Sequence, residues 1–344
     1  MTIKIELNSD QIQKSFDANT ATSQECGEAA QKGSVPKDNF VFFAAFDGTN
    51  NDMNNLAGDF QSTNVAQLWN QYKGGASDNL NGGYYPGLGT SGQPNKDTWL
   101  PPAVTLGVIQ TAKQAYADFA REASDWLQDH PDKGVSVVLT AFSRGVASAV
   151  IFSQLLYKRG LVLPFPSGKI LIQPGETNIS AGVLFDPVAT GVEGNLAFPP
   201  DVKNVLAIKA LNEYRNLFKA VDYSNQNDVI TTLAMYGNHC DIGGSYDNGL
   251  AALSLEASTR FLIASGLPIG EVPSERQCVR DTIAVHSEEY DRFGNKIWDV
   301  YNEDGFSFAD RRLFDKKLTI RPASRPTGSG TRGFTMFDGA RITM

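Results

Sequence analysis

The most constraining feature of this 344-residue chain is an apolar run that ends at a serine and is followed by a second apolar run. Residues 135–142 consist mainly of Val, Leu, Ala and Phe, a pattern typical of a strand buried on both faces. Ser143, Arg144 and Gly145 follow, and residues 146–158 are rich in Ala, Val and Leu, which predicts a helix. The segment therefore predicts a buried strand, a sharp turn with Ser143 at its tip, and a helix.

A serine at the tip of such a turn is typical of a catalytic nucleophile. The strand and the helix nearly touch there, so the residues two before and two after the serine must be small; here they are Ala141 and Gly145. The helix N-terminus favours an oxyanion, with the backbone N–H of Arg144 as one donor. The alternative is an ordinary buried strand followed by a helix whose N-cap is Ser143.

Strand-like and helix-like segments alternate on both sides of this unit. We expect strands at residues 39–46, 135–142, 179–185, 202–210 and 228–236, and helices at residues 64–72, 105–130, 144–158 and 250–265. The alternation predicts an α/β fold, α/β-hydrolase-like, with a mostly parallel central sheet and helices on both faces. We divide the chain into a polar N-terminal arm with at most one short helix (1–37), a catalytic core (38–270) and a C-terminal extension of short strands and loops (271–344). Residues 74–96 are expected to form a long loop.

Composition excludes several classes of function. The net charge of −8 argues against a nucleic-acid-binding protein and against purely electrostatic binding to anionic membranes. Cys26, Cys240 and Cys278 are too irregularly spaced for a disulfide framework or a zinc cluster, and we expect neither a metal nor another cofactor. The first residues lack the features of a signal peptide, and no apolar run is long enough for a transmembrane helix. We therefore expect a chain made in the cytoplasm that leaves it, if at all, by a non-Sec route.

Polar residues follow four of the predicted strands, namely Asp47, Ser143, Asp186 and His239. The carboxyl ends of parallel strands lie at one edge of a sheet, so we expect these side chains to converge. A serine hydroxyl needs a base within hydrogen-bond reach, and the base needs a carboxylate that orients it. The chain order Ser143, Asp186, His239 is the hydrolase order of nucleophile, acid and base.

Alternatives remain open for the other roles. His286 also follows a strand-like run and competes with His239 as the base, and Asp241 competes as the acid. A second oxyanion donor is expected near Gly48, where glycine lets the backbone approach a substrate. Asp47 and Asp52 either hold that turn by hydrogen bonds or bind a cation.

Five motifs occur in the order in which one family carries them. They are residues 46–51 (FDGTNN), 85–90 (YPGLGT), 141–145 (AFSRG), 185–188 (FDPV) and 239–244 (HCDIGG). In these motifs the chain resembles the uncharacterised α/β-hydrolase family that includes type VI secretion lipase effectors, the Tle1-like phospholipase catalytic domain. It departs from the family at Ala141, where a glycine is usual, and at Pro187, where a threonine is usual.

The resemblance implies an esterase that hydrolyses the acyl esters of phospholipids, of phospholipase A1 or A2 type. It implies Ser143 as nucleophile, Asp186 as acid and His239 as base. It also implies an antibacterial toxin that a secretion-machine carrier delivers into the periplasm of a rival cell, with an immunity protein in the producer.

Two other classes of function compete with this interpretation. One is a metal-dependent phosphoesterase, because residues 237–239 (Gly-Asn-His) resemble the metal-binding turn of metallophosphatases, with Asp47, Asp186 and Asp241 as oxygen ligands. Three histidines are few for a dinuclear site. The other is a binding module that keeps the hydrolase fold without its chemistry.

Overall fold

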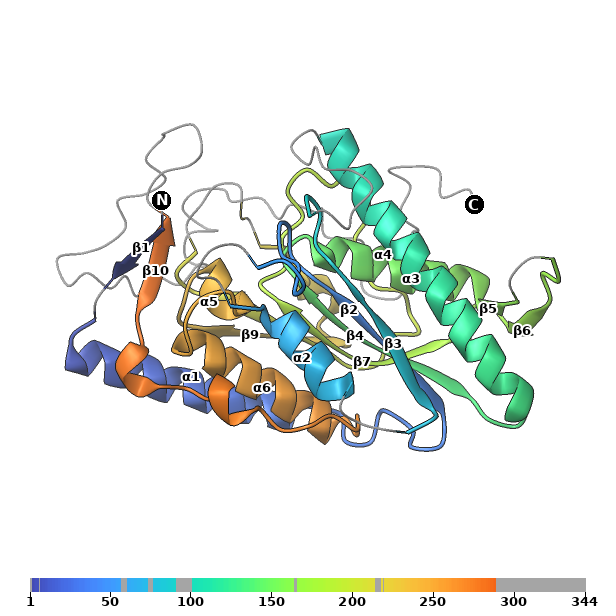
Figure 1. Cartoon of the computed structure of the whole chain (residues 1–344), viewed down its shortest axis with the longest axis horizontal. Coiled ribbons are helices and arrows are strands. Elements are labelled where there is room, and N and C mark those ends of the chain that lie inside the picture. The colour runs from blue at the N-terminus through green and yellow to red at the C-terminus, as the bar shows by residue number, and fades with distance from the viewer. Residues whose placement is uncertain are drawn as a thin grey trace.

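The centre of the molecule is a six-stranded sheet with the order β3-β2-β4-β7-β8-β9, in which all neighbours are parallel (Figure 1). The computed structural model describes residues 2–5, 7–56, 61–73, 77–90, 101–163, 166–213, 218 and 220–288. The strands of this sheet are β2 (Phe40–Phe46), β3 (Leu80–Tyr85), β4 (Val135–Phe142), β7 (Asn178–Phe185), β8 (Val205–Ala210) and β9 (Ile230–Met235). Two small antiparallel sheets pair β1 (Thr2–Ile5) with β10 (Val285–Glu288) and β5 (Leu161–Val162) with β6 (Ile170–Ile172).

Helices cover both faces of the sheet, which gives an α/β-hydrolase-like fold. They are α1 (Ser9–Ala29), α2 (Asn64–Lys73), α3 (Pro101–Asp129), α4 (Gly145–Arg159), the short α5 (His239–Gly243) and α6 (Leu250–Ala264). Figure 1 shows α3 and α4 on one face, with α2, α6 and α1 on the other. Within the described residues, no helix is both long and apolar enough to cross a membrane.

Strand β2 shows how the sheet separates two cores. Successive side chains of a strand point to opposite faces. Phe42 and Phe46 therefore pack with α3 and α4, whereas Val41 and Phe43 pack with α2 and α6. All residues of β2 and β4 are buried, which explains why both strands are largely apolar in the sequence.

The strand order places the predicted nucleophile where the direction of the chain across the sheet reverses. From β2 the chain moves outward to β3, then returns to β4 on the other side of β2 and continues to β7, β8 and β9. Such a switch point, at the carboxyl ends of the strands, is where α/β sheets form sites. Phe142 of β4 pairs with Phe185 of β7, so the following residues, Ser143 and Asp186, leave the sheet side by side.

Strand β3 lies inside the segment that was predicted to be a long loop. Its sequence, LNGGYY, has little of the residue preference of a strand, and backbone pairing with β2 holds it instead. A Cβ on Gly82 would lie 2.2 Å from the carbonyl oxygen of Phe43. The glycine that made the segment look like a loop is therefore what allows the close approach of the two strands.

The N-terminal segment is a 21-residue helix, longer and more closely packed than the single short helix expected there. Helix α1 runs alongside α6 (Figure 1). Its buried stripe is mostly polar and consists of Gln11, Ser15, Asn19, Ser23 and Cys26. The sequence does not predict this stripe, because its buried side chains are mostly polar and give no hydrophobic periodicity. Of the predicted C-terminal extension, residues 289–344 lie outside the described residues, and the domain boundaries stay a prediction.

Candidate active site

Ser143 occupies a tight turn between β4 and α4. Its backbone φ is +56°, a left-handed conformation that non-glycine residues seldom adopt and that is common at functional sites. A Cβ on Gly145 would lie 2.5 Å from the carbonyl oxygen of Asp47, so this position has no room for a side chain. The turn has the steric form that the sequence predicted for a nucleophile.

Backbone hydrogen bonds hold the turn from both sides. The N–H of Ser143 donates to the carbonyl of Phe185 at 3.1 Å, and its own carbonyl accepts from Val146 N at 3.2 Å and from Val188 N at 3.3 Å. Ser143 is 5% exposed. The strained residue is therefore fixed to the neighbouring strand end and to the first turn of α4.

Asp186 and His239 meet at the carboxyl edge of the sheet. His239 Nδ1 lies 2.7 Å from Asp186 Oδ2, and the other carboxylate oxygen, Oδ1, accepts from Ala210 N at 3.0 Å. Both side chains are at most 3% exposed, and Asp186, like Ser143, has a positive φ, here +35°. The carboxylate is thus placed to orient one nitrogen of the imidazole ring, which is what a catalytic base requires.

The His239 ring lies between two aromatic rings. Its centroid is 4.5 Å from that of Phe142 and 4.8 Å from that of Phe218, the latter nearly perpendicular at 72°. Phe142 is the residue immediately before Ser143. The ring that contacts Asp186 therefore also packs against the strand that carries the serine, so the structure gathers all three predicted residues at one edge.

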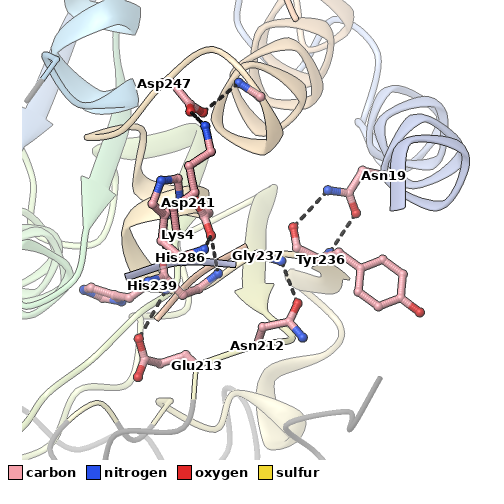
Figure 2. Close-up of polar contacts among 12 residues, drawn as sticks. Lys4, Asn19, Asn212, Glu213, Tyr236, Gly237, His239, Asp241, Asp247 and His286 are labelled. Atoms are coloured by element: carbon pink, nitrogen blue, oxygen red, sulfur yellow. Dashed lines mark hydrogen bonds and ion pairs between the residues drawn. The ribbon is translucent and has the colours of Figure 1, made fainter. Parts of the chain in front are cut away.

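The turn that carries His239 is fixed by side chains on several sides (Figure 2). Gly237 N donates to Asn212 Oδ1 at 2.9 Å, and His239 N donates to Glu213 Oε2 at 3.3 Å. Asn238 caps α5, and its N–H donates to Asp241 Oδ2 at 2.9 Å. Asn212 and Glu213 follow β8, and neither was predicted as a site residue from the sequence.

Gly48 lies where a second oxyanion donor was expected, but its N–H is engaged. It donates to Asp47 Oδ1 at 2.7 Å, while Asp47 Oδ2 accepts from Thr63 Oγ1 at 2.7 Å and from Tyr84 Oη at 2.6 Å. Burial raises the pKa of Asp47 to about 6, although these hydrogen bonds oppose the shift. Asp47 therefore holds the turn by hydrogen bonds, the first of the two roles considered for it.

Thr49, the residue after Gly48, was not predicted as a site residue from the sequence. Thr49 Oγ1 is buried and has no hydrogen-bond partner within the described part of the chain. A Cβ on the preceding Gly48 would lie 2.6 Å from Phe142 Cδ1, so this turn packs directly against the end of β4. The signal in the sequence was a threonine beside the glycine at a strand end.

Arg144, expected to supply the other donor through its backbone, is the N-cap of α4. Its side chain is half-buried, and burial lowers its pKa to about 10. The residue lines a small cavity of about 10 Å³ with Phe46, Tyr85 and Thr111. A cationic group therefore lies beside the edge where an oxyanion would form.

The two alternates, Asp241 and His286, pair with each other. His286 Nδ1 lies 2.5 Å from Asp241 Oδ1, and His286 N donates to Asp241 Oδ2 at 3.0 Å. Tyr246 stacks on the His286 ring at 4.0 Å. This second buried pair joins β10 to α5, and Figure 2 shows both residues close to the turn that carries His239.

We expect the second pair to contribute to stability rather than to catalysis. Burial by itself lowers the pKa of His286, but the hydrogen bond and charge of Asp241 outweigh it and the pKa is raised. A raised folded-state pKa adds stability that is complete below about pH 6.5, the usual histidine pKa, and is lost as pH rises through the folded-state pKa. His286→Ala should therefore lower Tm more at pH 6 than at pH 9. At pH 6 the loss in free energy of unfolding should be on the order of 2 kcal/mol.

Arg260→Ala is the matched control, because it removes an exposed ion pair, that of Arg260 with Glu256 on α6. It should change stability little at either pH. A His286→Ala variant that retains its Tm but loses ester hydrolysis would contradict the structural role.

The three carboxylates that a metal site would require have separate partners. Asp47 accepts from Tyr84, Asp186 contacts His239, and Asp241 contacts His286. Across the described ranges, no group of three His, Cys, Asp or Glu side chains is placed to hold a metal ion.

No protein-family model and no curated protein sequence matches the chain. Among solved structures it is similar to an uncharacterised protein from Pseudomonas aeruginosa, with a TM-score of 0.48 and 16% identity over 80% of this chain and 52% of that one. It is also similar to the Tle1 effector bound to the VgrG spike of the type VI secretion system, with a TM-score of 0.46 and 18% identity over 61% of this chain and 51% of that one.

Esterase B from Lactobacillus rhamnosis is a third similar structure, with a TM-score of 0.33 and 14% identity over 75% of this chain and 95% of that one. The chain spans about half the length of the first two structures. One of these structures is a Tle1 effector, and the sequence motifs resemble the Tle1-like family.

Proposed function

We propose that the chain is a serine esterase of phospholipase A1 or A2 type and acts as an antibacterial effector of a type VI secretion system. One observation carries the esterase part: the buried contact of 2.7 Å between His239 Nδ1 and Asp186 Oδ2, beside a strained serine turn. The effector part comes from the sequence resemblance.

In the proposed reaction, Ser143 Oγ attacks the ester carbonyl while His239 takes the hydroxyl proton. Asp186 orients the imidazole and stabilises its protonated form. The oxyanion accepts hydrogen bonds from the backbone N–H of Arg144 and from Thr49. His239 then gives the proton to the departing lysophospholipid alcohol, and a water molecule, activated in the same way, releases the fatty acid and restores Ser143.

The substrate, the carrier and the immunity protein in this proposal are those that the resemblance to the Tle1-like family implies. The substrate is a membrane phospholipid, the carrier is a component of the secretion machine, and the producer protects itself with an immunity protein. The chain is made in the cytoplasm of the producer and acts in the periplasm of the target cell.

Product analysis on defined phospholipid vesicles tests the proposal. We expect wild-type protein to release free fatty acid and lysophospholipid from phosphatidylethanolamine and phosphatidylglycerol, with no change in rate when EDTA is added. Chains labelled separately at sn-1 and sn-2 distinguish type A1 from type A2. A fluorophosphonate probe should label Ser143, because it reacts with activated serines.

Other products would contradict the proposal. Release of a phosphorylated head group that stops with EDTA would favour the metal-dependent phosphoesterase. Absence of both acyl release and probe labelling would favour the binding module.

A further inference from the structure

Strand β9 forms one edge of the sheet. Just after it, the backbone N–H and C=O of Tyr236 form hydrogen bonds with a side chain instead of with a neighbouring strand. β9 pairs with β8 on one side. On the other side, Tyr236 N donates to Asn19 Oδ1 at 2.7 Å, and Asn19 Nδ2 donates to the carbonyl of Tyr236 at 3.0 Å. A carboxamide that accepts and donates in this way makes the two hydrogen bonds that a neighbouring strand would make. Figure 2 shows Asn19 reaching from α1 to this backbone.

Asn19 is placed for this contact by the packing of α1. Its side chain is 1% exposed, although it belongs to a helix of polar composition. One turn further along, Thr22 Oγ1 lies 3.4 Å from the carbonyl of Ala234, two residues before Tyr236 on the same side of the strand. Burying an asparagine without partners is costly, so the bidentate contact also explains why the residue is tolerated there.

The contact lies three residues before His239. Between them, Gly237 has a φ of +132°, and a Cβ there would lie 2.7 Å from the Cβ of Asp241. The chain thus turns sharply from β9 into α5. Asn212 holds Gly237 from the β8 side, whereas Asn19 holds Tyr236 from the open side. A shift of the backbone at Tyr236 would move the imidazole relative to Asp186 and Ser143.

We propose that Asn19 is a positioning residue for His239, and that α1 acts on the candidate site through this one side chain. The inference rests on the proposed esterase function. Misplacement of a catalytic group by about 1 Å can cost on the order of 100-fold in rate, so loss of the contact should lower kcat and leave substrate binding largely unchanged.

The test compares three variants for esterase kinetics, fluorophosphonate labelling rate and Tm. Asn19→Ala removes both hydrogen bonds, and we expect kcat to fall by about 10- to 100-fold with KM within about threefold of wild type. Ser23→Ala is the matched control: Ser23 lies on the same buried stripe one turn along, and its hydroxyl has no partner within the described residues. It should keep the wild-type kcat.

Asn19→Asp adds a second measurement, the pH dependence of kcat relative to wild type, which a purely structural role of Asn19 would not change. The ionised carboxylate can accept from Tyr236 N but cannot donate to its carbonyl, whereas the protonated acid can do both. Burial favours the protonated form. The kcat of this variant, divided by that of wild type at the same pH, should therefore rise as pH falls, while the same ratio for Ser23→Ala stays constant.

The outcomes separate the inference from the function on which it rests. If Asn19→Ala folds and keeps the wild-type kcat, the inference is overturned while the esterase function stands. If Asn19→Ala fails to fold, the pH series of Asn19→Asp decides, and a flat ratio overturns the inference. If wild-type protein hydrolyses no ester and Ser143 takes no probe, both fail together.

Discussion

Ser143→Ala is expected to lower kcat for ester hydrolysis by about 10⁴-fold or more, with the fold retained. In the proposed mechanism the hydroxyl oxygen forms the acyl-enzyme, so the variant would lose the covalent route and keep only what the oxyanion donors and substrate binding provide. The backbone bonds of this residue to Phe185, Val146 and Val188 do not involve its side chain. Fatty-acid release from vesicles, probe labelling and a thermal melt together check the prediction.

Ser153→Ala is the control for this experiment. Ser153 is also a buried serine, located further along α4, and its hydroxyl donates to the carbonyl of Ala149 within its own helix. It should keep near-wild-type activity. A Ser143→Ala variant that still hydrolyses esters at the wild-type rate would disprove the nucleophile assignment.

Asp186→Asn should lower kcat by a similar amount, about 10⁴-fold. The amide has nearly the shape of the carboxylate and can still accept from Ala210 N, so the fold should survive. Its NH2 group, however, cannot accept from His239 Nδ1, which favours the wrong tautomer and no longer stabilises the protonated ring. The measurement is kcat against KM on a soluble ester, with the Tm of each variant recorded.

Asp247→Asn provides the control, because Asp247 lies in the segment after α5 and bonds to Lys4 at the surface. It should retain wild-type kinetics. Equal loss of kcat in both variants would indicate a general disturbance of this edge of the sheet and would argue against a specific role for Asp186.

The sequence predicted best those features that depend on one local pattern. Largely apolar runs mark β2, β4 and β7, because both faces of these strands are buried. The polar residues that follow them, including Ser143 and Asp186, lie side by side because parallel strands end at the same edge. The sequence predicted that His239 lies at this same edge for the same reason, because His239 follows β9 by only a few residues.

What the sequence did not reveal depends on contacts between distant segments. Strand β3 is held by backbone pairing with β2, so its glycines hid it. Helix α1 buries polar side chains such as Asn19, whose partner is more than two hundred residues away. The Gly48 N–H, expected as an oxyanion donor, instead bonds to the side chain of Asp47. The pairing of His286 with Asp241 likewise joins segments far apart in the chain.

The uniform direction of the six central strands has a practical consequence for work with this protein. The loops that carry Ser143, Asp186 and His239 emerge from one rim, and the turn that leads into β4 emerges from the opposite rim. Residues 131–133 form this turn and are exposed. A fluorophore or an affinity handle attached there would be separated from the candidate site by the full height of the sheet, so the molecule can be immobilised or tracked while that site stays uncovered.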